Sequence, residues 1–319
     1  MGSGRWDTNV YTASSTYRKS SGISDFEYSD SGATTVHTRL SPLNNIRESR
    51  DSAEHPQSKA IAVLLDVTGS MNRVPRDLQT KLPGLYQLLL DKGYVKDPQI
   101  LFGAIGDATC DKVPLQIGQF ESDNRSDEDL RALVLEGGGG GQMTESYELA
   151  MYFMARSTSI DCFDKRGQRG YLFIIGDEMP YDKVSRAQVQ RWVGGDLTET
   201  LTTDQLVEEL CRKYHVYYIL PAGSTHMRDT TVQSKWRALL GQNVILLDDL
   251  NATCETIALT IGLSEGAIDL NTGLTHLTDV GSGATVKTVE KALATVVKGA
   301  VATGPELTSG GASSHTTRL

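Results

Sequence analysis

The sequence predicts an α/β fold, a doubly wound and mostly parallel open sheet with helices on both faces. Five short apolar runs, each followed by Gly, Asp or Pro, are continuous rather than alternating, as expected for strands that are buried on both faces. Segments with helical periodicity separate these runs. Because strands and helices alternate along the chain, the connections are predicted to be crossovers between parallel strands.

The elements follow in order along the chain. The expected buried strands are residues 60–65, 100–105, 171–175, 216–220 and 244–247. The expected helices are residues 74–90, 145–154, 186–192, 204–213, 231–240 and 253–261. Residues 113–120 (VPLQIGQF) alternate in polarity and follow the preceding strand closely, so they are predicted to form an antiparallel edge strand joined by a hairpin. Its proline suits an edge position.

Composition divides the chain into three parts. Residues 58–263 contain the predicted strands and helices. Residues 1–57 form a Ser/Thr-rich arm without apolar periodicity, which we expect to be extended or disordered in isolation. Its aromatic residues predict that the arm docks as a strap on a neighbouring surface. The alternative is a flexible tail in which these aromatic residues have no role. Residues 264–319 form a C-terminal extension with one short helix, at residues 286–298, and a loose terminus.

Charge and hydropathy exclude several classes of protein. The formal net charge of −9 and the absence of a basic stripe argue against a nucleic-acid-binding protein. No run approaches the roughly 18 apolar residues that span a bilayer, and the first residues lack the apolar core of a signal peptide. We therefore expect a cytoplasmic protein that does not enter a membrane. Four single cysteines without a CxxC pair predict reduced thiols and no zinc site.

Oxygen-bearing side chains gather at the carboxyl ends of the predicted strands, the edge at which open α/β sheets bind ligands. They are Asp66, Thr68, Ser70, Asp107, Thr144, Asp177 and Glu178. No His, Cys or Lys is among them, so neither a histidine-based triad nor a thiol nucleophile is predicted. Hard oxygen donors favour a hard divalent cation such as Mg²⁺. Asp107 is interpreted as a turn residue that could also take part.

Three motifs in order resemble the metal-ion-dependent adhesion site (MIDAS) of von Willebrand factor A (VWA) domains. They are D-x-T-G-S at residues 66–70, a glycine-led Thr144, and Asp177 after a buried strand. The resemblance covers roughly residues 58–263, which it identifies as a VWA-like domain with the Rossmann-like VWA fold. It implies Thr68, Ser70 and Thr144 as direct ligands, and Asp66 and Asp177 as ligands that act directly or through water.

The resemblance also implies the cation and its partner. The expected ion is Mg²⁺, with Mn²⁺ or Ca²⁺ as alternatives, and a carboxylate of a partner protein would complete its coordination. A cation held mainly by neutral hydroxyls keeps much of its charge and therefore attracts an external acid. This sequence departs from the family at residues 176–178, where Gly-Asp-Glu replaces Thr-Asp-Gly and adds Glu178 beside the metal. Glu145 is interpreted as an acid that stabilises the start of a helix.

The leading functional interpretation is a non-enzymatic, Mg²⁺-dependent interaction module that acts as an intracellular adaptor or scaffold. Its resemblance to bacterial cytoplasmic VWA proteins implies a MoxR-type AAA+ ATPase as a partner. One alternative is a metal-dependent phosphohydrolase with Asp66 as nucleophile, although Thr68 stands where a second acid is needed. Another is a self-assembling structural protein, a homo-oligomer joined through the N-terminal arm.

The glycine run at residues 137–141 invites comparison with a phosphate-binding loop. A Walker loop places Lys-Ser or Lys-Thr after its last glycine, whereas Gln142 and Met143 follow here. A nucleotide site is therefore not favoured. The run is interpreted as a stretch that lets the loop approach a metal or move on binding, and a simple linker stays open as the alternative.

Overall fold

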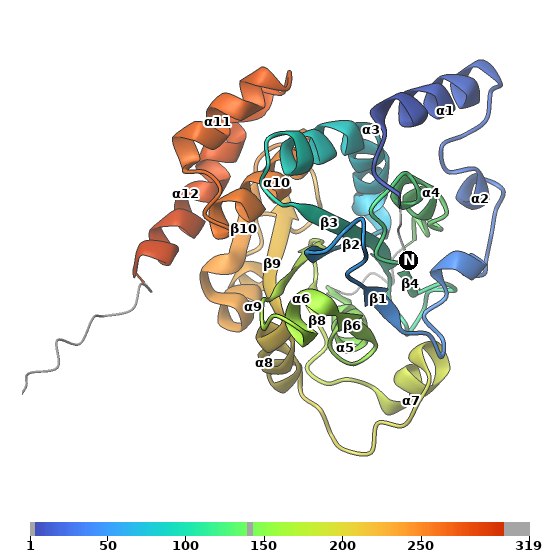
Figure 1. Ribbon diagram of the computed structural model, residues 1–319. Coiled ribbons are helices and arrows are strands. Elements are labelled where there is room, and N and C mark those ends of the chain that lie inside the picture. The colour runs from blue at the N-terminus through green and yellow to red at the C-terminus, as the bar shows by residue number, and fades with distance from the viewer. Residues whose placement is uncertain (1–3, 139–142, 303–319) are drawn as a thin grey trace, which may run out of the picture.

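The computed structural model describes residues 4–138 and 143–302 and contains a central six-stranded sheet (Figure 1). The strand order is β10-β9-β7-β2-β3-β4, in which β4 is antiparallel to β3 and the other neighbours are parallel. The strands are β2 (Ser58–Asp66), β3 (Asp97–Ile105), β4 (Leu115–Ile117), β7 (Gly170–Ile175), β9 (Tyr214–Pro221) and β10 (Val244–Leu247). The predicted fold class, including the antiparallel edge strand, is confirmed.

The central strands are buried on both faces. All nine residues of β2 are buried, and alternate side chains enter two separate cores. Ile61, Val63 and Leu65 pack in one hydrophobic cluster, while Ala62 and Leu64 pack in the other. Full burial of one such aliphatic side chain stabilises the fold by about 1.5–3 kcal/mol. This two-sided burial explains why the strand sequence is apolar without alternation.

Helices cover both faces of the sheet. In Figure 1, α3 and α10 lie on one face and α5 and α8 on the other, in agreement with the two clusters. The first layer includes α3 (Val74–Tyr86), its π-helical continuation η3 (Gln87–Asp91), α4 (Arg125–Arg131) and α10 (Thr253–Ser264). The second includes α5 (Tyr147–Arg156), α8 (Thr203–Lys213) and α9 (Thr230–Leu240). The predicted helices therefore form, with shifted ends.

Short elements join these layers. Two small parallel pairs were not predicted, because two or three residues carry no periodic signal: β1 (Arg47–Ser49) with β6 (Thr158–Ile160), and β5 (Thr144–Glu145) with β8 (Met179–Pro180). The remaining short helices and turns are η1 (Thr38–Leu40), η2 (Gly69–Arg73), α6 (Asp161–Asp164), α7 (Arg186–Gln188), η4 (Val189–Val193), η5 (Gly241–Asn243), η6 (Leu250–Ala252) and η7 (Gly283–Thr285).

The N-terminal segment is helical and packed, which corrects the expectation of an extended arm. It contains α1 (Thr8–Ser20), capped by Asp7, and α2 (Glu27–Asp30). The Trp6 ring stacks on Tyr86 with centroids 4.2 Å apart, and Phe26 is buried in the main core. These aromatic side chains therefore dock on their own chain. The low apolar content gave no sign of this packing, because the residues that contact the core are few and widely spaced in the sequence.

The C-terminal extension also joins the core. The predicted helix at residues 286–298 is confirmed as α12 (Val286–Ala302), and an unpredicted helix, α11 (Leu270–Asp279), precedes it. Leu277, Val289 and Leu293 are buried in the main cluster, and α12 packs against β10. The predicted loose terminus, residues 303–319, lies outside the described residues. Within the described part of the chain, no helix is both long and apolar enough to cross a bilayer.

Candidate functional site

The sheet topology places Asp66 and Asp177 at one point of the sheet edge. Strand β2 pairs with β3 on one side and with β7 on the other, so the strand order reverses between β2 and β7. Asp66 is the last residue of β2, and Asp177 follows the end of β7 by two residues. In doubly wound sheets, ligands bind in the crevice outside the carboxyl ends at such a reversal. The sheet topology and the sequence motifs therefore indicate the same candidate binding site, at the carboxyl ends of β2 and β7.

Asp66 is fully buried and held by three donors. Its Oδ1 accepts hydrogen bonds from the Thr68 backbone N–H at 2.9 Å and from the Thr68 hydroxyl at 2.7 Å. The Tyr147 hydroxyl donates to Oδ2 at 2.6 Å. Burial, with a smaller contribution from the Asp177 carboxylate, raises the pKa of Asp66 to about 7 against the lowering effect of these hydrogen bonds. A carboxylate so placed would be stabilised by a cation.

Tyr147 explains why glycine stands at position 176. A Cβ atom on Gly176 would lie 2.1 Å from the Tyr147 hydroxyl oxygen, which is far inside van der Waals contact. The Tyr147 ring is itself fixed edge-on against Trp236, with centroids 5.3 Å apart. The family threonine would therefore exclude Tyr147 and its bond to Asp66. Tyr147 was not predicted as a site residue, and the sequence signal that points to it is the glycine at position 176 in the third motif.

The third motif is anchored by β9, by the loop after it and by α9. The Asp177 side chain is 3% exposed, and its Oδ2 accepts a hydrogen bond from the His226 backbone N–H at 3.1 Å. The main-chain oxygen of Glu178 accepts from Trp236 Nε1 at 2.7 Å and from the Tyr218 hydroxyl at 3.2 Å. These contacts hold Asp177 at the carboxyl edge of β7 and fix the direction of the chain that follows it.

The structure places Thr144 at the same edge but not in a helix. Thr144 lies in β5, in register with Met179 of β8, so the short pair holds it beside the third motif. Its hydroxyl hydrogen-bonds with that of Tyr181, which also donates to Asp107 Oδ2 at 3.1 Å. Asp107 further accepts from the Thr109 backbone N–H at 2.9 Å, as expected for a turn residue.

The first motif and the glycine run lie against each other. The Gly69 backbone N–H donates to the Gly138 carbonyl at 2.8 Å, and that of Gly137 donates to the Val67 carbonyl at 3.3 Å. Ser70 is the second residue of η2, and its side chain lies outside the described part of the structure. Residues 139–142, which contain the other three glycines, are likewise outside it. The described contacts show that the glycine run reaches the first motif.

Two further acids lie in the site. Burial raises the pKa of Glu145 to about 10 and that of Glu178 to about 8, and Asp66 is the next largest influence on each. The Oε2 atom of each is buried without a hydrogen-bond partner. The interpretation of Glu145 as a helix-start acid is wrong, because it precedes the N-cap residue Ser146 and lies in β5 with its carboxylate among other acids.

These residues fit a cation only as a mixed donor set. Within residues 4–138 and 143–302, no three His, Cys, Asp or Glu side chains are grouped so that they could hold a metal by themselves. A cation would therefore depend on hydroxyl oxygens as well as carboxylates, which is the donor set that the resemblance implies. The two orphaned carboxylate oxygens are consistent with a cation, because buried acceptors are almost always satisfied in native proteins.

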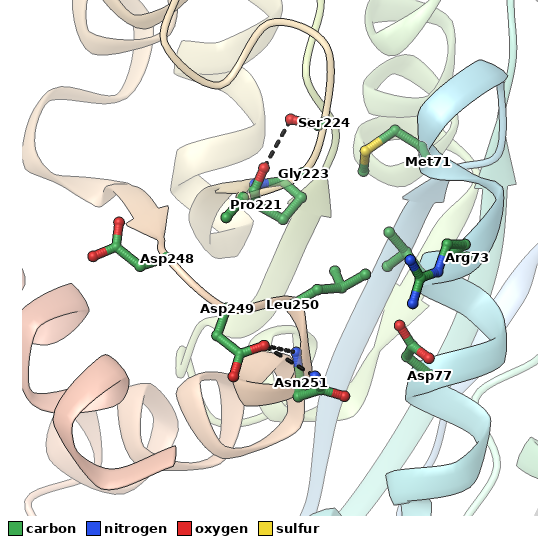
Figure 2. Close-up of a pocket in the computed structure, with 12 residues that line it drawn as sticks. Met71, Arg73, Asp77, Pro221, Gly223, Ser224, Asp248, Asp249, Leu250 and Asn251 are labelled. Atoms are coloured by element: carbon green, nitrogen blue, oxygen red, sulfur yellow. Dashed lines mark hydrogen bonds between the residues drawn. The ribbon is translucent and has the colours of Figure 1, made fainter. Parts of the chain in front are cut away.

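A cavity of about 260 Å³ opens on the same edge of the sheet (Figure 2). Met71 and Arg73, which follow the first motif, line one side of it. The loops after β9 and β10 line the other, where Ser224 Oγ donates to the Pro221 carbonyl at 2.7 Å and Asp249 Oδ1 accepts from the Asn251 backbone N–H. The cavity therefore adjoins the residues that follow the first motif, and hydrogen bonds within the two loops order its other wall.

Comparison with known proteins finds no matching family model and no matching curated protein. Similar solved structures include the pilus adhesin SpaC from Lactobacillus rhamnosus GG in an open conformation, with 8% identity and a TM-score of 0.45 over 74% of this chain and 33% of that chain. Proximal thread matrix protein 1 from the mussel byssus is 10% identical, with a TM-score of 0.41 over 65% of this chain and 48% of that chain. This chain thus spans a third to a half of those chains, and likeness at this level carries no argument about ligand or activity.

Proposed function

We propose that this protein is a non-enzymatic interaction module, a cytoplasmic adaptor or scaffold that binds its partner through a divalent cation. The cation is Mg²⁺, with Mn²⁺ or Ca²⁺ as alternatives, at Asp66, Thr68, Ser70, Thr144 and Asp177. The observation that carries the proposal is that two buried acids, Asp66 and Asp177, meet at the strand-order reversal, with the buried Glu145 beside Thr144. Burying like charges together is costly unless a cation or protons neutralise them.

The cation would link this protein to an acidic group on its partner. Hydroxyl ligands are neutral, so an ion that they hold retains positive charge toward the outside. A carboxylate of the partner would approach from the carboxyl edge of the sheet, and the adjoining cavity offers room for a neighbouring side chain. A MoxR-type AAA+ ATPase is the partner class that the family resemblance implies.

The burial of Asp66 favours this function over phosphohydrolysis. A nucleophilic carboxylate needs an oxygen that can reach the phosphorus atom of the substrate. Asp66 is 0% exposed, and both of its oxygens accept hydrogen bonds, from Thr68 and Tyr147. The Thr68 hydroxyl, which donates to Asp66, is too weakly acidic to serve as the general acid that protonates the leaving group. The arrangement therefore supports a cation-holding role for Asp66.

The test compares thermal unfolding after EDTA treatment, with and without added Mg²⁺ or Mn²⁺. A cation present at 100 times its dissociation constant adds about 2.7 kcal/mol to the free energy of unfolding. For 319 residues this corresponds to a rise in Tm of about 4 °C. We expect this rise for the wild type and for Asp182→Asn, a control that changes an exposed carboxylate paired with Lys235. We expect no rise for Asp66→Ala or Ser70→Ala.

The partner is tested by cation-dependent pulldown from the native cell. Wild-type protein should retain a partner in Mg²⁺ and release it in EDTA, while Asp66→Ala should retain none. Equal melting shifts in all variants would refute the site. A partner that stays bound in EDTA would refute the cation as the link.

A further inference from the structure

Glu145 and Glu178 are buried acids that the proposed ligand set does not use. The Glu145 side chain is 2% exposed, and its Oε2 has no hydrogen-bond partner. Glu178 is half-buried, and its Oε2 is equally unpartnered. A buried acceptor without a hydrogen-bond partner destabilises the folded state, and more so when it is charged. Two such oxygens at one site call for a common physical explanation.

The backbone brings the two glutamates to the same place. Glu145 pairs in register with Pro180 in the β5–β8 pair, and the Met179 backbone N–H donates to the Met143 carbonyl at 3.0 Å. Glu178 directly precedes this pair, and its main chain is fixed by Trp236. After burial, the Asp66 carboxylate is the largest influence that raises the pKa of Glu145 and of Glu178. The backbone therefore places both glutamates near the carboxyl end of β7.

The surrounding elements supply further acids. Asp66 approaches from β2, Asp177 from the end of β7, and Asp107 and Asp111 from the loop after β3. Asp107 and Asp111 already accept backbone hydrogen bonds, from Thr109 and from Asp107 respectively. The orphaned glutamate oxygens are thus the acceptors that still need a positive group. A divalent cation, bound directly or through water, is a positive group that would satisfy such oxygens, and carboxylate oxygens are ligands that Mg²⁺ and Mn²⁺ prefer.

We infer that Glu145 and Glu178 bind the cation themselves, directly or through water, and so supply from within the chain the acidic ligands that a partner would otherwise provide. This inference rests on the proposed function, since it concerns the same cation. Its consequence is that the free protein holds the cation without a partner. A partner's carboxylate would then have to displace Glu145 or Glu178 from the cation. The contact that the cation makes with the partner is therefore weaker than at a site without these acids.

The test measures Mn²⁺ binding to metal-free protein by isothermal titration calorimetry and by the electron paramagnetic resonance signal of free Mn²⁺. The variants are Glu145→Gln and Glu178→Gln, which keep the side-chain shape and remove the charge. Asp66→Asn reports on the site as a whole. Glu148→Gln is the matched control, because Glu148 is another buried acid whose Oε2 is already satisfied by the Tyr181 backbone N–H at 3.1 Å. A cooperative melting transition in EDTA shows that each variant is folded. If Glu145→Gln does not fold, Glu178→Gln, at a half-buried position, still tests the inference.

We expect wild type and Glu148→Gln to bind one Mn²⁺ with equal affinity, and Glu145→Gln and Glu178→Gln each to bind about tenfold or more weakly, as when groups that support a metal are removed. If Asp66→Asn abolishes binding but both glutamine variants bind as tightly as wild type, this inference is overturned and the proposed function stands. If wild type binds no Mn²⁺, or Asp66→Asn binds like wild type, the proposed function fails, and the inference fails with it.

Discussion

Replacing Gly176 with alanine should break the contact that holds Asp66. The added Cβ would lie 2.1 Å from the Tyr147 hydroxyl oxygen, 2.8 Å from Cζ and 2.9 Å from Cε1. Tyr147 has little room to move, because it is fully buried, packs against Trp236 and donates to Asp66 at 2.6 Å. Overpacking of a core costs about 1–3 kcal/mol, and loss of a hydrogen bond to a charged group costs about 1.5–3 kcal/mol. We therefore expect Gly176→Ala to lower the free energy of unfolding by roughly 3–5 kcal/mol.

A double-mutant cycle with Tyr147→Phe tests this reasoning. Phenylalanine removes the hydroxyl and with it the 2.1 Å contact, while the ring contacts remain, so part of the cost should disappear. We expect the double variant to be less destabilised than the sum of the single variants by about 1 kcal/mol or more. Urea unfolding in EDTA measures each value. Gly84→Ala is the control, because a Cβ there meets nothing within 4 Å in α3, and it should be neutral or stabilising. A cost below about 0.5 kcal/mol for Gly176→Ala, or strictly additive costs, would refute the account of Tyr147.

Two further predictions follow from buried groups. Burial raises the pKa of Glu148 from its ordinary 4.5 to about 8. The folded state therefore holds a proton that the unfolded state has released, and stability falls as pH rises from about 4.5 to 8 and then levels off. Glu148→Gln should flatten this fall in urea unfolding at a series of pH values, and an unchanged slope would count against it. Deleting residues 1–57 removes Tyr11, Phe26 and Leu40 from the main core, and each large buried side chain contributes about 3–5 kcal/mol. The truncated protein should lose its cooperative thermal transition, whereas an unchanged Tm would show that this segment is a separate arm.

Much of the fold could be predicted from the sequence because burial leaves a continuous apolar pattern. The run at residues 60–65 carries that pattern, and the structure extends it to β2 with every residue buried. The N-terminal segment left no such signal, since Trp6 and Phe26 are flanked by charged residues and form no periodic apolar pattern. Its packing is decided by contacts with Tyr86 and the core far along the chain, which local periodicity does not report.

The candidate site was predictable where chemistry and spacing coincide. Asp66 and Asp177 follow buried strands, and the topology places both at the strand-order reversal. The surroundings of these acids could not be predicted. In the sequence, Glu145 stands where an acid at the start of a helix would stand. The structure instead places it in the short β5–β8 pair, where other acids raise its pKa. Tyr147 likewise belongs to a helix pattern, and its bond to Asp66 depends on the space left by Gly176.

The most direct test of the central claim is X-ray diffraction from crystals soaked in Mn²⁺, recorded at a wavelength where manganese scatters anomalously. The account predicts one anomalous peak at the carboxyl ends of β2 and β7, next to Asp66 and within reach of oxygens from Thr68 and Asp177, and no peak there in Asp66→Asn crystals. Well-ordered wild-type crystals without a peak at this edge, or with manganese bound only elsewhere, would contradict it.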